Sequence, residues 1–283
     1  MQLTTALEGY WLSKARTVSQ NTIKDYSHTY DRFVRFLAGQ AIEDMEAIKP
    51  QHIDAFLTWL ATDEGLAPKT VLNHWIALSS LWTWAEKEMD QPHIIRGRVA
   101  QPRVRRQQPE PYTHENVKRM IEACDQTDTW CTMPGVRTRR ATAKRDRAIL
   151  LTLLDTGLRA SELCALRIED YDKQTGRLLV RNGKGGKSRS VFLGYTARSA
   201  LWKYLEDRKR RRKELTGEKD LARIEALFCT GTSGHMSRVN LLHMIQGIGR
   251  RADVEGANVH RWRHTFAINM LRNGCNPYAL QEL

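Results

Sequence analysis

The sequence predicts a mainly α-helical protein with a small antiparallel β-sheet, in which a four-helix N-terminal domain precedes an α+β domain. Apolar residues recur at helical spacing over most of the chain, and residues 177–193 alternate around a glycine-rich tip as a β-hairpin does. Charge also divides the chain. Residues 1–95 hold 8 Lys and Arg against 12 Asp and Glu, whereas the remainder holds 37 against 20. We therefore expect domains at 1–95 and 112–283, joined by a linker at 96–111.

Composition limits the class of protein. The apolar fraction of 41% is too high for a disordered chain, and no apolar run reaches the roughly 18 residues of a membrane span. No basic segment followed by an apolar stretch opens the sequence, and five sparse cysteines are typical of reduced thiols. We expect a cytoplasmic protein. Its formal net charge of +13 indicates a polyanionic partner, most often nucleic acid.

Four helices are expected in the N-terminal domain. The apolar spacing and the Ser, Pro and Gly residues at the boundaries predict a short helix near residues 6–11, then helices over 19–39, over 50–65 and from Pro68 onward. Their aromatic residues have the spacing of a bundle core rather than of base-stacking platforms. Lys69, Asn73 and His74 are expected on the polar side of the last helix, where they are candidates for a DNA groove.

The predicted linker at 96–111 contains five Arg and three Pro and has little apolar content. Proline disfavours helix and sheet pairing, and like charges repel, so the segment should be extended. We expect Arg98, Arg103, Arg105 and Arg106 to contact a DNA backbone, the alternative being a solvated loop.

Two further basic segments are ambiguous. Residues 126–147 form an irregular stretch that is either a surface insertion or a phosphate contact. Residues 208–213 are consecutive basic residues near the end of a helix that begins near Thr196, and this run can be a solvated helix face.

The segment DTGLRASEL places Arg159 in the first turn of a helix that begins just after an apolar helix ends at Gly157. A guanidinium beside the free N–H groups of a helix N-terminus makes an anion site. Glu162, three residues on, can orient the guanidinium. The alternative is an ordinary surface Arg at a helix start.

The hairpin RLLVRNGKGGKSRSVFL carries Lys184 and Lys187 at its glycine-rich tip. A Lys at such a tip can reach into a groove and donate a proton to a departing oxygen. The alternative is a tip that is basic only for solubility. The segment lacks the pattern of a P-loop, because no Gly-Lys-Ser/Thr follows a four-residue gap.

In HRWRHTFA, His260 and Arg263 lie three residues apart and so share one helix face. An imidazole beside a guanidinium suits stabilising and protonating a phosphoryl oxygen. His260 and His264 have the spacing of a zinc helix, but the residues between them are Arg-Trp-Arg and no further ligand is evident. We expect no metal site.

These three motifs, in this order and spacing, resemble those of the tyrosine recombinase (phage integrase) family, and the resemblance spans nearly the whole chain. It implies a SAM-like core-binding domain at 1–95 and a catalytic domain at 112–283. It also implies a reaction without metal or nucleotide cofactor, double-stranded DNA at specific recombination sites as partner, a homotetramer on DNA, and a bacterial or phage origin close to the nucleoid.

The resemblance further implies the chemistry: a Tyr attacks a DNA phosphodiester, a 3′-phosphotyrosyl link forms, and a 5′ hydroxyl of another strand reverses the step. Arg159 and Arg263 would clamp the non-bridging oxygens, Lys184 would be the general acid, and His260 would assist proton transfer. Glu162 and His264 would support these groups, and Lys187 would contact DNA.

Two departures from the family pattern affect this expectation. Trp262 stands where the family usually has Leu, and the family pattern continues to Leu-Gly-His (or Trp) and a Tyr nucleophile beyond position 283. Tyr195, Tyr204 and Tyr278 lack motif support as nucleophiles, so we expect a shortened recombinase that does not cleave DNA alone.

Two alternatives differ in class. The first is a sequence-specific DNA-binding regulator, derived from a recombinase, that does not cleave. The more distant one is a metal-dependent nuclease. Acidic clusters such as Glu169-Asp170 and Asp172 exist, but they lie on the approach to a strand and no other ligand cluster accompanies them.

Overall fold

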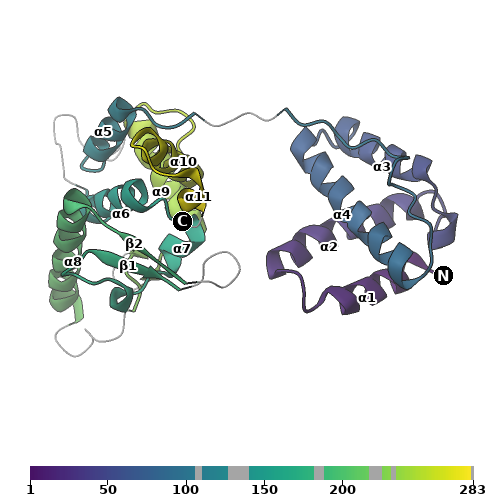
Figure 1. Cartoon of the computed structure of the whole chain (residues 1–283), viewed down its shortest axis with the longest axis horizontal. Coiled ribbons are helices and arrows are strands. Elements are labelled where there is room, and N and C mark those ends of the chain that lie inside the picture. Colours follow the sequence, from purple (N-terminus) through teal and green to yellow (C-terminus); the bar gives the residue numbers. More distant parts are fainter. Residues whose placement is uncertain (106–109, 127–139, 182–187, 217–224, 231–233, 282–283) are drawn as a thin grey trace. The chain divides into compact units, whose positions relative to one another are not determined.

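The computed structural model describes the chain except for residues 106–109, 127–139, 182–187, 217–224, 231–233 and 282–283. The chain forms two compact units, Met1–Gln107 and Gln108–Leu283 (Figure 1). The predicted fold class is confirmed: each unit is mainly helical, and the strands form small antiparallel sheets. The first unit extends beyond the boundary expected at residue 95, because Val99 is buried in its core.

The first unit is the expected four-helix bundle. Its helices are α1 (Leu3–Lys14), α2 (Gln20–Ala38), α3 (Pro50–Thr62) and α4 (Pro68–Glu88), with a 3-10 turn at Met45–Ala47. The Ser19 hydroxyl caps α2 by accepting a hydrogen bond from the Thr22 N–H, and proline occupies the first position of both α3 and α4. The aromatic residues are in the core, where Phe33 and Phe56 meet edge to face.

One expectation for α4 is wrong: His74 does not lie on its exposed side. Its side chain is only 4% exposed and packs between Phe56 and His28, with ring centroids 6.1 and 6.2 Å away. Polarity alone places His74 on the solvent side of α4, but the faces of an imidazole ring are apolar and can pack in a core. Lys69 and Asn73 are exposed, as expected.

Burial of His74 predicts a pH dependence. Burial, followed by repulsion from Arg32 and His28, lowers the pKa of His74 to about 4, against 6.5 when exposed. The neutral ring is therefore favoured by folding. Its contribution is fully present above pH 6.5 and is lost as the pH falls toward 4, by about 3 kcal/mol.

His74→Leu should remove this part of the pH dependence, which urea unfolding at a series of pH values would measure. His114→Gln, which replaces an exposed histidine of the second unit, is the control. Identical pH profiles for His74→Leu and the wild type would contradict the assignment.

The second unit contains seven helices and four short strands within its described residues. These are α5 (His114–Ala123), α6 (Ala143–Thr156), α7 (Ala160–Ala165), a 3-10 turn (Ile168–Asp170), β1 (Arg177–Val180), β2 (Arg189–Phe192), α8 (Tyr195–Thr216), β3 (Cys229–Thr230), β4 (Gly234–His235), α9 (Arg238–Arg251), α10 (Val259–Arg272) and α11 (Pro277–Gln281). Strands β1 and β2 form the expected antiparallel hairpin, with Val180 opposite Arg189.

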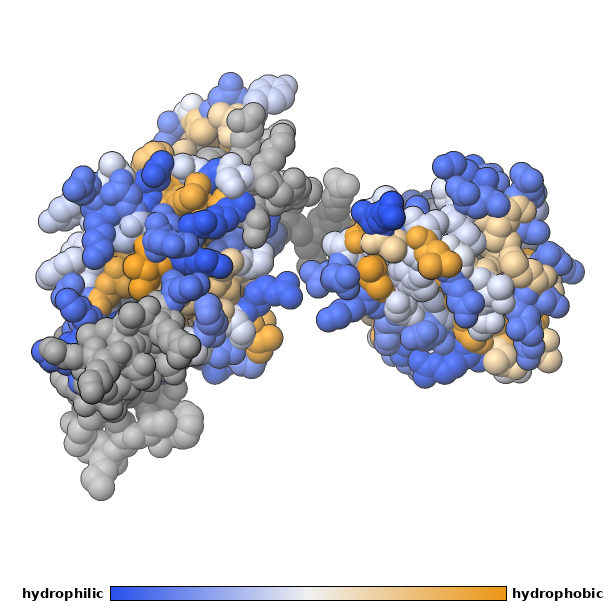
Figure 2. All heavy atoms as spheres, turned by 90° about the horizontal axis from the view of Figure 1, so that it is seen from below, coloured by the Kyte–Doolittle hydropathy of each residue, from blue (hydrophilic) through white to orange (hydrophobic). Residues whose placement is uncertain are grey.

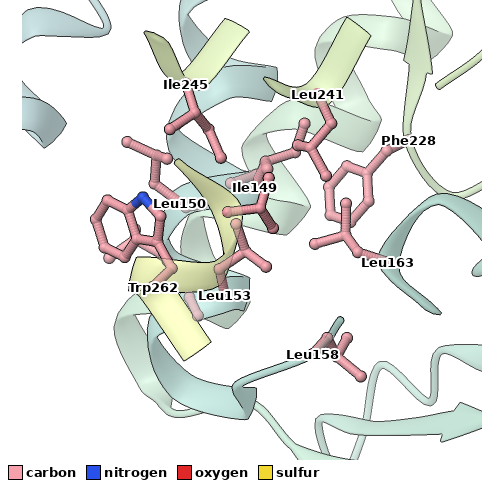
Figure 3. Packing of buried hydrophobic residues seen from close by; sticks show 14 of the residues in the cluster. Ile149, Leu150, Leu153, Leu158, Leu163, Phe228, Leu241, Ile245 and Trp262 are labelled. Carbon is pink, nitrogen blue, oxygen red and sulfur yellow. The ribbon is translucent and has the colours of Figure 1, made fainter. Parts of the chain in front are cut away.

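Helix α6 runs through the core of this unit and contacts both α8 and α10. Figure 3 shows Ile149, Leu150 and Leu153 of α6 packed near Trp262 of α10 and Ile245 of α9. All five side chains are fully buried. This packing holds α10 against the C-terminal end of α6, where the residues of the predicted site lie.

Two residues of the ambiguous basic segments have partners within the fold. Arg208 is only 8% exposed and donates to the carbonyl oxygens of Ala226 and Leu227. Lys144 lies 2.7 Å from Asp207. The idea that residues 208–213 are only a solvated face is therefore wrong for Arg208. Of the ambiguous stretch 126–147, residues 127–139 lie outside the described part of the chain.

Hydrophilic residues cover most of the surface visible in Figure 2, interrupted by smaller hydrophobic patches. Exposed aromatic side chains in the second unit include Phe192, Tyr195 and Trp202. In the described part of the chain, every helix is too short or too polar to cross a membrane.

Candidate active site

The site begins at the turn between α6 and α7. Gly157 ends α6 in the left-handed conformation, with φ of +58°, and a Cβ at this position would overlap the ring of Phe266. Leu158 is buried, and the next residue, Arg159, is the N-cap of α7. The backbone conformation and the contact with Phe266 therefore require glycine at position 157. The sharp turn that follows places the Arg159 side chain at the start of α7.

Glu162 orients Arg159. Its carboxylate accepts hydrogen bonds from the backbone N–H of Arg159 at 2.8 Å and from Nη1 of the same residue at 2.8 Å. Arg189, from β2, binds the same carboxylate through Nη1 at 2.9 Å and Nη2 at 2.8 Å. Burial raises the pKa of Glu162, but the hydrogen bonds from Arg189 and Arg159 outweigh it and lower the pKa to about 2.

This lowered pKa predicts how the second unit responds to acid. The stability that Glu162 contributes is fully present above its ordinary pKa of 4.5 and is lost as the pH falls toward 2, by about 3 kcal/mol. Glu162→Gln should lower the free energy of unfolding at pH 7 and flatten its fall between pH 5 and about 2. Urea unfolding at each pH measures both effects. The exposed Glu122→Gln is the control, and a wild-type acid profile in Glu162→Gln would contradict the prediction.

Helix α10 supplies the second half of the site. The Asn258 side chain caps the helix by accepting from the N–H of Arg261 at 2.9 Å. One turn of helix then carries an exposed His260 and a half-buried Arg263 on the same face. Nη1 of Arg263 donates to the Gly157 carbonyl oxygen at 2.6 Å, which links α10 to the turn after α6. Burial, together with the nearby charge of Arg159, lowers the pKa of Arg263.

These residues surround one pocket of about 430 Å³. It is lined by Leu158, Arg159, Ala160, Arg238, Leu242, Asn258, Val259, His260 and Arg263. Guanidinium groups from α9, α10 and the start of α7 therefore share a pocket with an imidazole. A guanidinium binds the oxygens of a phosphate through two parallel N–H donors. The pocket thus has the charge and the donors for a tetrahedral oxyanion.

The structure brings together four of the predicted site residues: Arg159, Glu162, His260 and Arg263. His264 is half-buried on α10 and is not one of the residues that line the pocket. Three other predicted residues, namely Lys184, Lys187 and Arg106, lie outside the described residues. Arg98, Arg103 and Arg105 are exposed in the first unit.

The acidic residues of the distant nuclease alternative have structural partners. Glu169 and Asp170 bind the guanidinium of Arg181, and Asp172 accepts hydrogen bonds from Thr175. Across the described residues, no group of three or more His, Cys, Asp or Glu side chains is arranged to hold a metal ion.

Sequence reasoning missed Arg189 and Arg238. Arg238 opens α9, after an N-cap at Ser237, and gave no distinctive signal. The sequence does contain a signal for Arg189: it lies two residues before the buried Val191, and so on the inward side of a strand. An inward Arg requires a carboxylate partner, which in this fold is Glu162.

Comparisons with known proteins agree on one family. The model of the phage integrase family matches residues 111–283, and that of the phage integrase N-terminal SAM-like domain matches residues 12–90. The chain is 30% identical to the tyrosine recombinase XerD of Brucella suis, over all of this chain and 89% of that protein. It is 29% identical to XerD of Mycobacterium leprae, over 99% and 88%. The fold is similar to that of the Tn1549 transposon integrase solved with circular intermediate DNA, with a TM-score of 0.72 and 18% identity over 99% of this chain and 90% of that one. The chain belongs to the phage integrase family, the tyrosine recombinases.

Proposed function

We propose that this protein is a site-specific DNA recombinase that cuts and rejoins strands through a 3′-phosphotyrosyl intermediate. The observation that carries the proposal is the convergence of Arg159, Arg263 and His260 on one pocket. Two guanidiniums and an imidazole supply what transfer of a DNA phosphoryl group demands, namely charge stabilisation and proton transfer.

The geometry supports a division of roles. Arg159 uses Nη1 to bind Glu162, and Arg263 uses Nη1 to bind the Gly157 carbonyl oxygen. Each guanidinium is thereby fixed while N–H groups remain for the non-bridging phosphate oxygens. Donors held in advance lose little energy to reorganisation as negative charge develops on the phosphoryl group. His260, exposed at the rim, is assigned to proton transfer, and Lys184 is assigned by resemblance to the leaving oxygen.

Double-stranded DNA is the proposed partner. The Tn1549 integrase was solved in complex with circular intermediate DNA, and we extend DNA binding from that protein to this one. The excess of 17 positive charges in residues 96–283, counted as 37 Lys and Arg against 20 Asp and Glu, supports the extension. We propose that Lys69, Asn73, Arg98, Arg103 and Arg105, all exposed, contact the backbone or groove, and that Arg106 and Lys187 join them. A homotetramer on paired sites, acting in the cytoplasm, completes the proposal.

The test is a covalent adduct. A binding site is first enriched from a pool of random duplexes, and a nicked version of it is incubated with the product of the complete gene. A protein–DNA band that survives a denaturing gel and disappears in Arg159→Ala is expected. Arg177→Ala, which removes an exposed arginine of the same unit, is the control. Specific binding without any Arg159-dependent band would overturn the proposal.

A second candidate is a DNA-binding regulator that does not cleave. It is favoured by one observation. Among the described residues, no tyrosine lines the pocket that contains Arg159, Arg238 and Arg263 (the arginine pocket), and Tyr278 of α11 is 79% exposed. This candidate predicts salt-sensitive, sequence-specific binding that survives Arg159→Ala. Sequencing the gene past codon 283 separates the two. Codons for Gly-His or Gly-Trp and then Tyr favour the recombinase, and an immediate stop codon favours the regulator.

A further inference from the structure

Arg189 makes a two-point contact with Glu162 beside the pocket, although it is not one of the residues that line the pocket. Its two terminal nitrogens each meet a different oxygen of Glu162, at 2.9 and 2.8 Å. The side chains are 14% and 3% exposed. A paired, two-point contact of this kind fixes orientation as well as distance, and its exclusion from water strengthens it.

The carboxylate of Glu162 also binds Arg159. Glu162 accepts from the Arg159 backbone N–H and from Nη1, so each of its oxygens receives hydrogen bonds from both arginines. A carboxylate has about four acceptor sites, and these four hydrogen bonds fill them. Glu162 consequently has little freedom to rotate, and the Nη1 atom of Arg159 is bound to a fixed point.

Charge gives Arg189 a second effect. Glu162 binds both Arg159 and Arg189, so its one negative charge is shared between two guanidinium groups. Without Arg189, Glu162 would pair with Arg159 alone, and its negative charge would offset the charge of that guanidinium in full. Arg189 is close enough to Arg263 that its charge contributes to lowering the pKa of that residue.

We propose that Arg189 is a positioning residue for phosphoryl transfer. Through Glu162 it sets the orientation of Arg159, and it keeps the positive charge of Arg159 available to the substrate phosphate. The inference rests on the proposed function. Arg189 is the first residue of β2, whereas Glu162 and Arg159 belong to α7 and its cap. The contact therefore fastens the hairpin to the start of the helix that presents Arg159.

The experiment measures oxyanion binding, so it does not depend on strand cleavage. Orthovanadate is titrated calorimetrically into the wild type, Arg159→Ala, Arg189→Met, Arg189→Lys and Arg177→Met. Vanadate binding that is lost in Arg159→Ala is binding in the arginine pocket. We expect about tenfold weaker binding in Arg189→Met, a smaller loss in Arg189→Lys, which keeps the charge but not the two-point contact, and wild-type affinity in Arg177→Met. Arg177 is an exposed arginine on the other strand of the same hairpin.

The outcomes separate the two proposals. Wild-type vanadate affinity in Arg189→Met, with Arg159→Ala still defective, would overturn the positioning role and leave the proposed function intact. Absence of any Arg159-dependent binding in the wild type would overturn both. Thermal unfolding accompanies each titration, and if Arg189→Met does not fold, Arg189→Lys decides: an affinity equal to that of the wild type would contradict the inference.

Discussion

Replacing Arg263 by Ala is expected to lower the rate of strand cleavage about 100- to 1000-fold, the usual cost of removing one fixed donor from a centre of developing negative charge. Arg263 is half-buried, lines the pocket, and is held by the Gly157 carbonyl oxygen at 2.6 Å. The loss should appear in the chemical step, because the donor acts on charge that develops in the transition state.

Single-turnover cleavage of a nicked duplex at saturating protein measures this rate. Arg272→Ala is the control, since Arg272 is an exposed arginine in the last turn of the same helix. Equilibrium DNA affinity should change little in either variant, because Arg263 is one of many basic residues. A cleavage rate for Arg263→Ala within a few fold of the wild type would contradict the assigned role.

Trp262→Ala is expected to destabilise the second unit by about 3–5 kcal/mol, the usual cost of emptying a large buried aromatic site. Trp262, labelled in Figure 3, is fully buried. Its ring lies 4.8 Å from that of Tyr112. Urea unfolding followed by circular dichroism measures the effect. Trp202→Ala, at an exposed position, should cost far less.

Trp262→Leu adds a comparison with the residue that the family usually has at this position. The indole Nε1 has no hydrogen-bond partner among the described residues, so the substitution sacrifices packing and no polar contact. A loss clearly smaller than that of Trp262→Ala is expected, because Leu refills part of the site. Equal losses in both variants would show that the aromatic ring, rather than its volume, holds α10 in place.

The sequence predicted well those elements whose apolar period and boundary residues agree. Helix α2 begins after Ser19 and α4 begins at Pro68, as capping and proline geometry require. Gly157 was placed correctly at the end of α6, because only a left-handed residue ends a helix so sharply. Arg159 and Glu162 meet because they lie three positions apart at the start of a helix.

Other features depend on contacts between distant segments and were not predicted. The burial of His74 arises from Phe56 on another helix, and polarity alone gave the wrong face. Arg208 is buried because the carbonyl groups of Ala226 and Leu227, 18 and 19 residues further on, accept its hydrogen bonds. Arg189 joins the site across 27 residues, through Glu162. The local pattern at each of these positions contains no information about the partner.

The chemistry of the cut ends distinguishes a pocket that transfers a DNA phosphoryl group to a tyrosine without a metal from a metal-dependent site. Nicked duplex carrying the enriched site is cleaved by the product of the complete gene in the presence of a chelator, and the ends are analysed by mass spectrometry. We expect a tyrosyl peptide bonded to a 3′ phosphate and a free 5′ hydroxyl on the released strand, neither of which forms in Arg159→Ala. Unlinked ends that carry a 5′ phosphate and require a divalent ion would contradict this expectation.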